Sequence, residues 1–360
     1  MPLPLPVSLS PSKVSSFTNC AMAFRFSAID RVPEPPTIWA AKGTLVHRAL
    51  ELLYLEEPHL RTVELALAKL AEATPEILGG REYAELVIAD QDMPAFHADA
   101  ERLVRNTFLL EDPTKIRPIG LELRMEASIN SLKLRGIIDR LELDENGGLI
   151  VTDYKTGKVP GERQEQGRLG GVQFYAFMVQ QMLGVRPAKV QLMYLSEPVM
   201  IINEPTEQTL RGLTMRTAAV WKAVERACER DDFRPKPSGL CNFCSFKQWC
   251  PAFGGDPASA PTRRLTHLPA DVEMIESVGL TVKAIRAHTA NVAANFVPTT
   301  EPFEPVSLGP LDVTHKAHDA HKAHDAPATS EATAAQTKTG GPLNLSESAD
   351  DLLLDSQPVT

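Results

Sequence analysis

The sequence predicts a mixed α/β fold in which helices flank a central sheet. Segments with helical periodicity alternate with strand-like segments, which favours this class. DENGG separates two strand-like runs, as a β-hairpin turn does. Hydrophobic residues (43%) and charged residues (23%) lie near the average for globular proteins. The 360 residues allow roughly two to three domains, or one large domain with a tail.

Each element follows from local periodicity. Ser12 is expected to cap the first helix, because a serine hydroxyl accepts hydrogen bonds from free N–H groups of a first helical turn. Helices are predicted at residues 12–24, 43–56, 62–73, 93–110, 169–183 and 206–230. Strands are predicted at residues 119–130, 132–143, 149–154, 189–195 and 199–203.

The composition changes after Ala260 and suggests three regions. Residues 1–260 form the predicted folded domain, residues 261–296 a helical extension, and residues 297–360 a disordered acidic tail. HKAHDA occurs twice in this tail; we interpret it as a solvated linker rather than a metal-binding tract. The segment ADDLLLDS near its end could fold on a protein partner.

Charge is unevenly distributed along the chain. The net charge is -9, and residues 301–360 carry 10 acidic and 3 basic residues, so the body is nearly neutral. Bulk charge therefore neither favours nor excludes a nucleic-acid partner, because a local basic groove can bind phosphates. The sequence has no signal peptide and no apolar run of roughly 18 residues, so we expect a soluble, cytoplasmic protein without a membrane segment.

Two aspartates and a lysine lie on the most informative hairpin. If its turn centres on Asn146, positions that sum to 292 are opposite, and Asp139 faces Asp153. Cross-strand Cβ atoms lie about 4.5–5.5 Å apart, so the two carboxylates could hold one divalent cation, Mg²⁺ or Mn²⁺. Lys155 shares the face of Asp153, because strand side chains alternate. The alternative is an exposed hairpin with scattered charges.

His47 is the candidate ligand on a helix. It lies in GTLVHRALELL, about 110° from the centre of the apolar stripe, so it is expected at the rim of the buried face. A rim position can reach a site at the helix edge. Considered alone, such a histidine is more often a surface or packing residue.

The cysteines indicate a second metal-binding element. Cys241, Cys244 and Cys250 form C-x2-C-x5-C, a spacing that favours metal over disulfides in a cytosolic chain. Zinc and an iron–sulfur cluster both require four ligands. The residues leave Cys20 and Cys228 open as the fourth, although a cysteine in a helix such as that of Cys228 is usually a small hydrophobe.

The order of these motifs along the chain resembles a known family. SLSPSKVSSFTNCAMAFRF, GTLVHRALE, LELRMEASI, GIIDR, DYKTG and CNFCSFKQWC follow one another across about residues 8–253. This order is similar to that of the RecB-like branch of the PD-(D/E)XK nucleases, near the iron–sulfur forms of the AddB subunit and of CRISPR-associated and phage exonucleases. The resemblance implies a restriction-endonuclease-like core with a helical insertion.

The resemblance also implies roles for individual residues. It assigns a structural four-iron four-sulfur cluster to Cys20 with the three clustered cysteines, although Ala21 stands where the family usually has proline. Gly171 stands where the family has glutamine four residues before a tyrosine, so Gln173 and Tyr175 are the nearest supporting candidates. The site residues implied are the metal ligands His47, Asp139, Asp153 and the Tyr154 carbonyl, the catalytic Lys155 and the supporting Glu122.

The function expected from sequence is metal-dependent hydrolysis of DNA, as an exonuclease on single-stranded ends in repair or recombination. The chain lacks G-x-x-x-x-G-K-[ST], so any helicase would be a separate partner. Two alternatives come from other classes of protein. One is a non-catalytic iron–sulfur DNA-binding module of a repair or CRISPR adaptation complex, and the other is a zinc-binding interaction protein.

Overall fold

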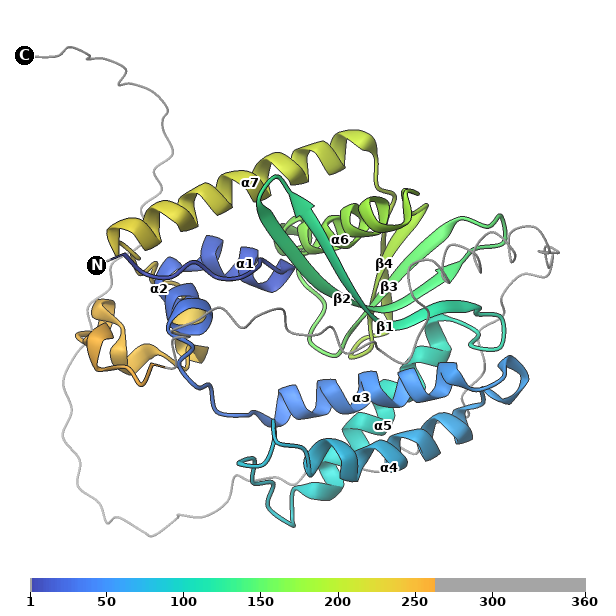
Figure 1. Ribbon diagram of the computed structural model, residues 1–360. Coiled ribbons are helices and arrows are strands. Elements are labelled where there is room, and N and C mark those ends of the chain that lie inside the picture. The colour runs from blue at the N-terminus through green and yellow to red at the C-terminus, as the bar shows by residue number, and fades with distance from the viewer. Residues whose placement is uncertain (1, 263–360) are drawn as a thin grey trace, which may run out of the picture. The chain divides into compact units, whose positions relative to one another are not determined.

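The computed structural model of the protein describes residues 2–262, apart from the side chains of residues 162–169. In this part of the chain a five-stranded sheet has the order β1-β2-β3-β4-β5 (Figure 1). Neighbouring strands are antiparallel except β3 and β4, which are parallel. The predicted mixed sheet is therefore confirmed. The strands are β1 (Pro118–Ile129), β2 (Leu132–Leu143), β3 (Leu149–Lys155), β4 (Lys189–Tyr194) and β5 (Val199–Asn203).

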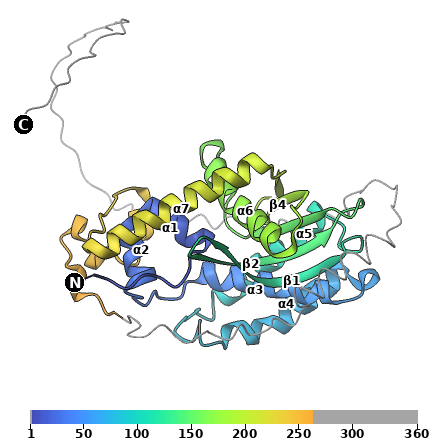
Figure 2. The same cartoon turned by 45° about the horizontal axis from the view of Figure 1, so that its top comes forward.

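Helices cover both faces of this sheet (Figures 1 and 2). Helices α3, α4 and α5 build one hydrophobic core, into which Tyr154 and Met193 of the sheet pack. Helices α6 and α7 contribute to a second core, which includes Val151 and Leu192. The helices are α1 (Pro11–Asn19), α2 (Ala21–Phe24), α3 (Ile38–Leu55), α4 (Val63–Leu78), α5 (Met93–Leu110), α6 (Glu162–Leu183) and α7 (Glu207–Arg230).

Several predicted helix boundaries were wrong: α3 begins five residues before its predicted start, and α4 ends five residues after its predicted end. The predicted helix 12–24 is two helices, because Cys20 is extended (φ -159°, ψ 108°) and ends α1 before α2 begins. The cap of α1 is Ser10 rather than Ser12: its hydroxyl accepts from the Lys13 N–H at 3.3 Å, and Pro11 occupies the first helical position. Helix α6 begins at Glu162, seven residues before the predicted start, despite three glycines between 167 and 171.

The predicted register of the β2–β3 hairpin is confirmed. Arg140 pairs with Thr152 and Leu143 with Leu149, so paired positions sum to 292. The turn chemistry is local. The Asp144 carboxylate accepts from the N–H groups of Asn146 (2.8 Å) and Gly148 (2.7 Å). Gly147 adopts φ 78° between them, a conformation that favours glycine.

The N-terminal segment of the chain contacts β2 and the C-terminal end of α7. The Leu3 N–H donates to the carbonyl of Cys228 at the end of α7 (2.8 Å), and Leu9 bridges to Leu134 on the edge of β2. Arg25 forms an ion pair with Asp231 at 2.8 Å. The predicted extension at residues 261–296 and the tail at 297–360 lie outside the described residues, apart from 261 and 262. No described helix is both long and apolar enough to cross a bilayer.

Candidate active site

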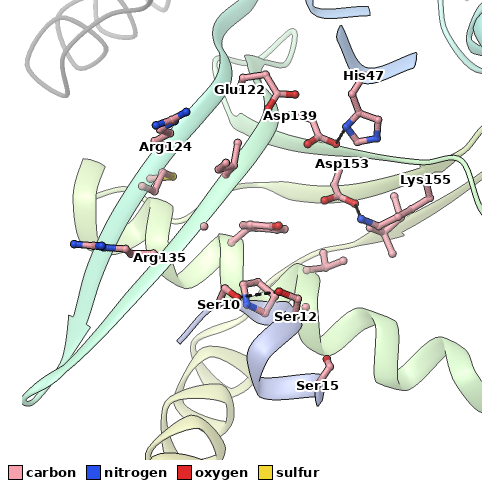
Figure 3. A pocket seen from close by; sticks show the side chains of 18 of the residues that line it. Ser10, Ser12, Ser15, His47, Glu122, Arg124, Arg135, Asp139, Asp153 and Lys155 are labelled. Carbon is pink, nitrogen blue, oxygen red and sulfur yellow. Dashed lines mark hydrogen bonds and ion pairs between the residues drawn. The ribbon is translucent and has the colours of Figure 1, made fainter. Parts of the chain in front are cut away.

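Three carboxylates lie abreast on three neighbouring strands (Figure 3). In the β1–β2 ladder, Leu121 pairs with Arg140 and Leu123 with Ile138, which places Glu122 opposite Asp139. The β2–β3 register continues to place Asp153 opposite Asp139 on the other side. Asp139 and Asp153 are buried, with 8% and 3% exposure. The sheet therefore brings together three acids that are distant in the sequence.

Glu122 has a strained backbone conformation at its place in this row. Its φ is 44°, in the left-handed region that non-glycine residues rarely adopt and that is concentrated at functional sites. Carboxylate oxygens of Glu122 and Asp139 and a ring nitrogen of His47 lie within 4.8 Å of one another. This is a set of donors that could hold a divalent cation.

His47 reaches the acids because α3 passes close to the end of β3. A Cβ atom at Gly43 would lie 3.1 Å from Oγ1 of Thr156, so glycine permits this approach. One turn later, Nδ1 of His47 lies 3.5 Å from Oδ2 of Asp139. The His47 ring meets the Tyr154 ring edge-on, with centroids 5.8 Å apart. The side chain is 27% exposed, which confirms its predicted position at the rim of the buried face.

The end of β3 holds the catalytic candidates in place. Lys155 forms an ion pair with Asp153, its neighbour on the same face. The Tyr154 N–H donates to Oδ2 of Asp139 at 2.6 Å, so a side chain links β2 to β3 beyond their last backbone pair. The hydrogen bond from Tyr154 to Asp139 and the ion pair between Lys155 and Asp153 thus connect the two aspartates and the lysine at the ends of β2 and β3.

A cleft of about 1000 Å³ opens over these residues. Hydroxyl groups of α1 line one side of it, and Figure 3 shows Ser12 and Ser15 across the cleft from Asp153. Tyr175 of α6 also lines the cleft, close to Gly136 of β2: a Cβ atom at Gly136 would lie 3.0 Å from its ring. The sequence analysis did not include the hydroxyl groups of α1 among the candidate site residues. The signal that could have found them is the concentration of four serines and Asn19 between residues 10 and 19, all of which line the cleft.

Gln173 does not take part in this cleft, unlike Tyr175. Its side-chain oxygen accepts a hydrogen bond from Arg216 of α7 at 3.2 Å. Residues two apart on a helix point about 200° from each other, so only one of the pair can face the cleft. We therefore drop Gln173 from the candidate site.

The three carboxyl groups differ in pKa. Burial opposes ionisation of Asp139, but His47 and Lys155, with the Tyr154 N–H bond, hold its pKa below the usual range. Burial and the charge of Asp139 raise the pKa of Glu122 to about 7. Burial and Asp139 likewise raise the pKa of Asp153 to about 6. Bringing a cation among these groups would relieve their mutual repulsion.

Glu122 is expected to make the stability of the metal-free protein depend on pH. Because its pKa is raised from 4.5 to about 7 in the folded state, its contribution to stability is complete below pH 4.5 and is lost as the pH rises through about 7. Thermal unfolding in chelator at both ends of this range, for the protein and for Glu122→Gln, measures the effect. The variant should lose less stability than the parent; an equal loss would contradict the assignment.

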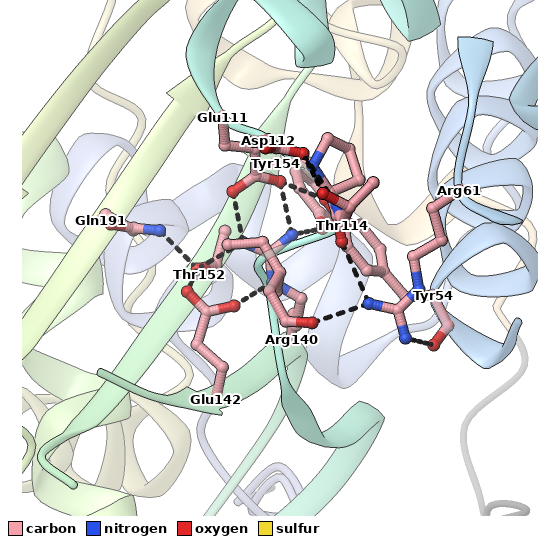
Figure 4. Close-up of polar contacts among 12 residues, drawn as sticks. Tyr54, Arg61, Glu111, Asp112, Thr114, Arg140, Glu142, Thr152, Tyr154 and Gln191 are labelled. Atoms are coloured by element: carbon pink, nitrogen blue, oxygen red, sulfur yellow. Dashed lines mark hydrogen bonds and ion pairs between the residues drawn. The ribbon is translucent and has the colours of Figure 1, made fainter. Parts of the chain in front are cut away.

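A buried ionic network supports the strands behind the acids (Figure 4). Arg140 is fully buried and donates to both carboxylate oxygens of Glu111 at 2.6 Å. It also donates to the Tyr154 hydroxyl at 2.7 Å, and its guanidinium lies 4.4 Å from the centre of the Tyr54 ring. Arg140 and Tyr154 each follow a site aspartate. The network therefore ties α3 and the end of α5 to the two strands that carry the acids.

Four of the five cysteines share a second cavity. Cys20, Cys241, Cys244 and Cys250 line it, together with Phe26 and Phe246. Burial raises the pKa of Cys244, and the three other cysteines add to the increase. Cys228 lies elsewhere: it is buried on α7, with Sγ 3.7 Å from the Pro4 carbonyl. Cys20, and not Cys228, therefore lies beside the three clustered cysteines.

The comparisons agree with this geometry. The model of the PD-(D/E)XK nuclease superfamily matches residues 8–251. "Gene 69 protein" of Mycobacterium phage D29 is 25% identical over 270 residues, which cover 68% of this chain and 96% of that protein. Its counterpart in Mycobacterium phage L5 is 24% identical over 296 residues, with the same coverage.

The mixed sheet flanked by helices is consistent with a nuclease core, and the chain belongs to the PD-(D/E)XK nuclease superfamily. Among solved structures, a candidate exonuclease from Eubacterium rectale is similar, with a TM-score of 0.39 and 11% identity. The match covers 66% of this chain and 92% of the other. This similarity is too low to support an inference about activity.

Proposed function

We propose that the protein is a divalent-metal-dependent deoxyribonuclease that hydrolyses phosphodiester bonds. The observation that carries the proposal is the row of Glu122, Asp139 and Asp153, with His47 and Lys155 beside it, in a cleft large enough for a nucleotide. Membership of a nuclease superfamily agrees with it.

The donors fit magnesium or manganese. Hard carboxylate oxygens are the ligands these ions prefer, and the imidazole of His47 would add one nitrogen donor. His47, Asp139 and Asp153 would hold the ion, with the Tyr154 carbonyl as a further ligand. Glu122, whose carboxylate lies within 4.8 Å of the donor atoms of His47 and Asp139, would support the ion from β1. A divalent ion bound there supplies an activated water and neutralises phosphate charge. The donor set is buried on one side and open to the cleft on the other.

The residues around the donors have separable tasks. Asp153 and the cluster of acids keep Lys155 charged: burial lowers its pKa, but Asp153 and Asp139 raise it above the ordinary value. Its ammonium can therefore bind a non-bridging phosphate oxygen and stabilise charge that develops there. The Tyr154 N–H orients Asp139, and Tyr175 limits the width of the cleft.

Exonuclease action on single-stranded ends is the finer part of the proposal. Linear and covalently closed circular single-stranded DNA of the same sequence distinguish the modes of cleavage, because a circle has no end. We expect release of mononucleotides or short products from the linear form and no loss of the circle. Cleavage of the circle at the same rate would replace the exonuclease proposal with an endonuclease.

The cysteine cavity is proposed to hold a four-iron four-sulfur cluster that staples the two ends of the domain. Cys20, Cys241, Cys244 and Cys250 line one cavity, and together they supply the four thiolates that such a cluster requires. A cluster there would join α1 to the segment after α7, which are far apart in sequence.

Cysteine variants are expected to separate this cluster from zinc. Cys20→Ser should remove the brown colour of anaerobically purified protein and its iron, because one of four thiolates is lost. Cys228→Ser is the matched control and should retain both, since Cys228 lies outside the cavity. Iron and zinc analysis measures the metals. Colourless parent protein with one zinc, or equal loss of iron in both variants, would contradict the cluster.

The cellular setting stays a prediction from sequence. It comprises a cytoplasmic location, a role in repair or recombination, a separate helicase, and a protein partner for the tail.

A further inference from the structure

The outer halves of β1 and β2 form a two-stranded arm beyond the rest of the sheet. The arm comprises residues 124–129 and 132–137, whereas β3 pairs with β2 only at residues 140–143. One face of the arm packs into the core through Met125, Ala127 and Leu134. The other face is therefore free to present side chains to solvent.

The free face of the arm is a basic strip. The ladder pairs Arg124 with Ile137, Glu126 with Arg135 and Ser128 with Lys133, so these side chains share that face. Ile137 is 44% exposed, an apolar surface beside Arg124. Figure 3 shows Arg124 and Arg135 leaving the arm on the same side. The strip carries three cations against one carboxylate.

The cations of the strip differ in how strongly they are already paired. Arg135 and Lys133 form ion pairs with Glu126, at 2.7 and 3.6 Å. Arg124 is exposed and has no acidic partner among the described residues. An exposed ion pair contributes little, so a phosphate can compete for Arg135 and Lys133. Arg124 is available to an anion without any such competition.

The strip continues directly from the row of acids. Arg124 follows Glu122 by two residues on β1, and its partner Ile137 precedes Asp139 by two residues on β2; Arg124 and Ile137 both line the same cleft. Successive pairs on one face of a strand are about 6.8 Å apart. Lys133 is six residues from Asp139, so the strip extends about 20 Å from the acids. The spacing of about 6.8 Å between successive pairs is comparable to the spacing of phosphates in an extended polynucleotide strand.

We infer that the free face of the β1–β2 arm binds the phosphate backbone of a single polynucleotide strand and leads it to the acids. The inference rests on the proposed nuclease function and adds the surface that holds the substrate. The acids require a cation, whereas the strip attracts anions, so each part of the cleft binds a different group of the same ligand. Ile137 offers apolar contact to a sugar or base.

Binding of a fluorescein-labelled oligothymidylate in chelator tests the arm without any need for cleavage. Loss of one phosphate contact should reduce the slope of log K against log salt by about 0.7 and weaken binding about fivefold at 0.1 M salt. We expect this of Arg124→Ala. The triple variant Arg124→Ala, Lys133→Ala, Arg135→Ala should bind about a hundredfold more weakly. Arg211→Ala, which removes an exposed arginine on α7 outside the cleft, should change neither quantity.

Two results would overturn the proposal that the arm binds a polynucleotide. One is no binding of the oligonucleotide by the parent protein, and the other is equal affinity and salt slope in the parent and the triple variant. Thermal unfolding of each variant establishes that it is folded. Cleavage of the dinucleotide dT–dT in manganese keeps the nuclease proposal separate, because this substrate is too short to reach Lys133. Weaker binding by the variants without any cleavage by the parent supports the arm and rejects the nuclease. Cleavage by the parent protein, together with unchanged binding in the variants, supports the nuclease and rejects the arm.

Discussion

Asp139→Asn is expected to lower the rate of metal-dependent cleavage roughly 10³-fold, about 4 kcal/mol in the activation free energy. Asp139 is the middle acid of the row and the one that stays most readily ionised. Asparagine has nearly the same shape and can still accept from the Tyr154 N–H through its carbonyl oxygen. The substitution therefore removes charge and metal affinity while it leaves the strand ends joined.

The rate of Asp139→Asn should be measured at saturating Mn²⁺, with the parent protein and Asp92→Asn alongside. Asp92 is an exposed aspartate that does not line the cleft, so Asp92→Asn controls for the change of charge alone. The melting temperature of each variant in chelator shows whether the fold is retained. Folded Asp139→Asn protein with more than a tenth of the parent activity would contradict its assignment as a metal ligand.

Glu111→Ala is expected to destabilise the fold by about 3–5 kcal/mol. The carboxylate of Glu111 is the bidentate partner of Arg140, which is fully buried, so its removal leaves a charge without its main compensation. Glu142, which forms an ion pair with Nε of Arg140, compensates only part of the loss, because Glu111 binds both terminal nitrogens of the guanidinium. Glu72→Ala is the control: the Glu72 side chain is 59% exposed and pairs with Lys69, which contributes less than about 1 kcal/mol.

Denaturant unfolding of both variants gives the free energies. A triple variant, Glu111→Leu with Arg140→Met and Glu142→Gln, sharpens the test, because it removes the whole buried charged group, and replacing such a group with uncharged residues of similar size is often nearly neutral. We expect it to be more stable than Glu111→Ala. If Glu111→Ala and Glu72→Ala lose the same stability, the network does not hold the strands as described.

The pairing of Asp139 with Asp153 could be predicted because it depends on local turn chemistry. Asp144, Asn146 and Gly147 set the β2–β3 turn, and the turn fixes which residues face each other along both strands. Periodicity alone was also sufficient to place His47 at the rim of α3. These features depend on neighbours within about a dozen residues, which a single sequence displays directly.

The rest depended on contacts between distant segments. Glu111 precedes Arg140 by 29 residues, and nothing in either local pattern indicates that they meet. The break at Cys20 interrupts an otherwise helical pattern, so periodicity predicted one helix where two exist. The left-handed backbone conformation of Glu122 and the exposure of Arg124 are likewise not visible in any local sequence pattern. For the cysteines, spacing identified three members of the group; the family resemblance added Cys20, which the fold places beside them.

Cleavage of end-labelled single-stranded and duplex DNA, in Mg²⁺ or Mn²⁺ and in chelator, tests the nuclease proposal most directly. Anaerobically purified protein retains any cluster, and Lys155→Ala serves as the variant that keeps the acids but lacks the ammonium. We predict cleavage by the parent protein that requires the metal and is lost in Lys155→Ala, with the released label giving the polarity. Cluster-replete protein that binds DNA but does not cut it with either metal would contradict the proposal and favour a non-catalytic DNA-binding module.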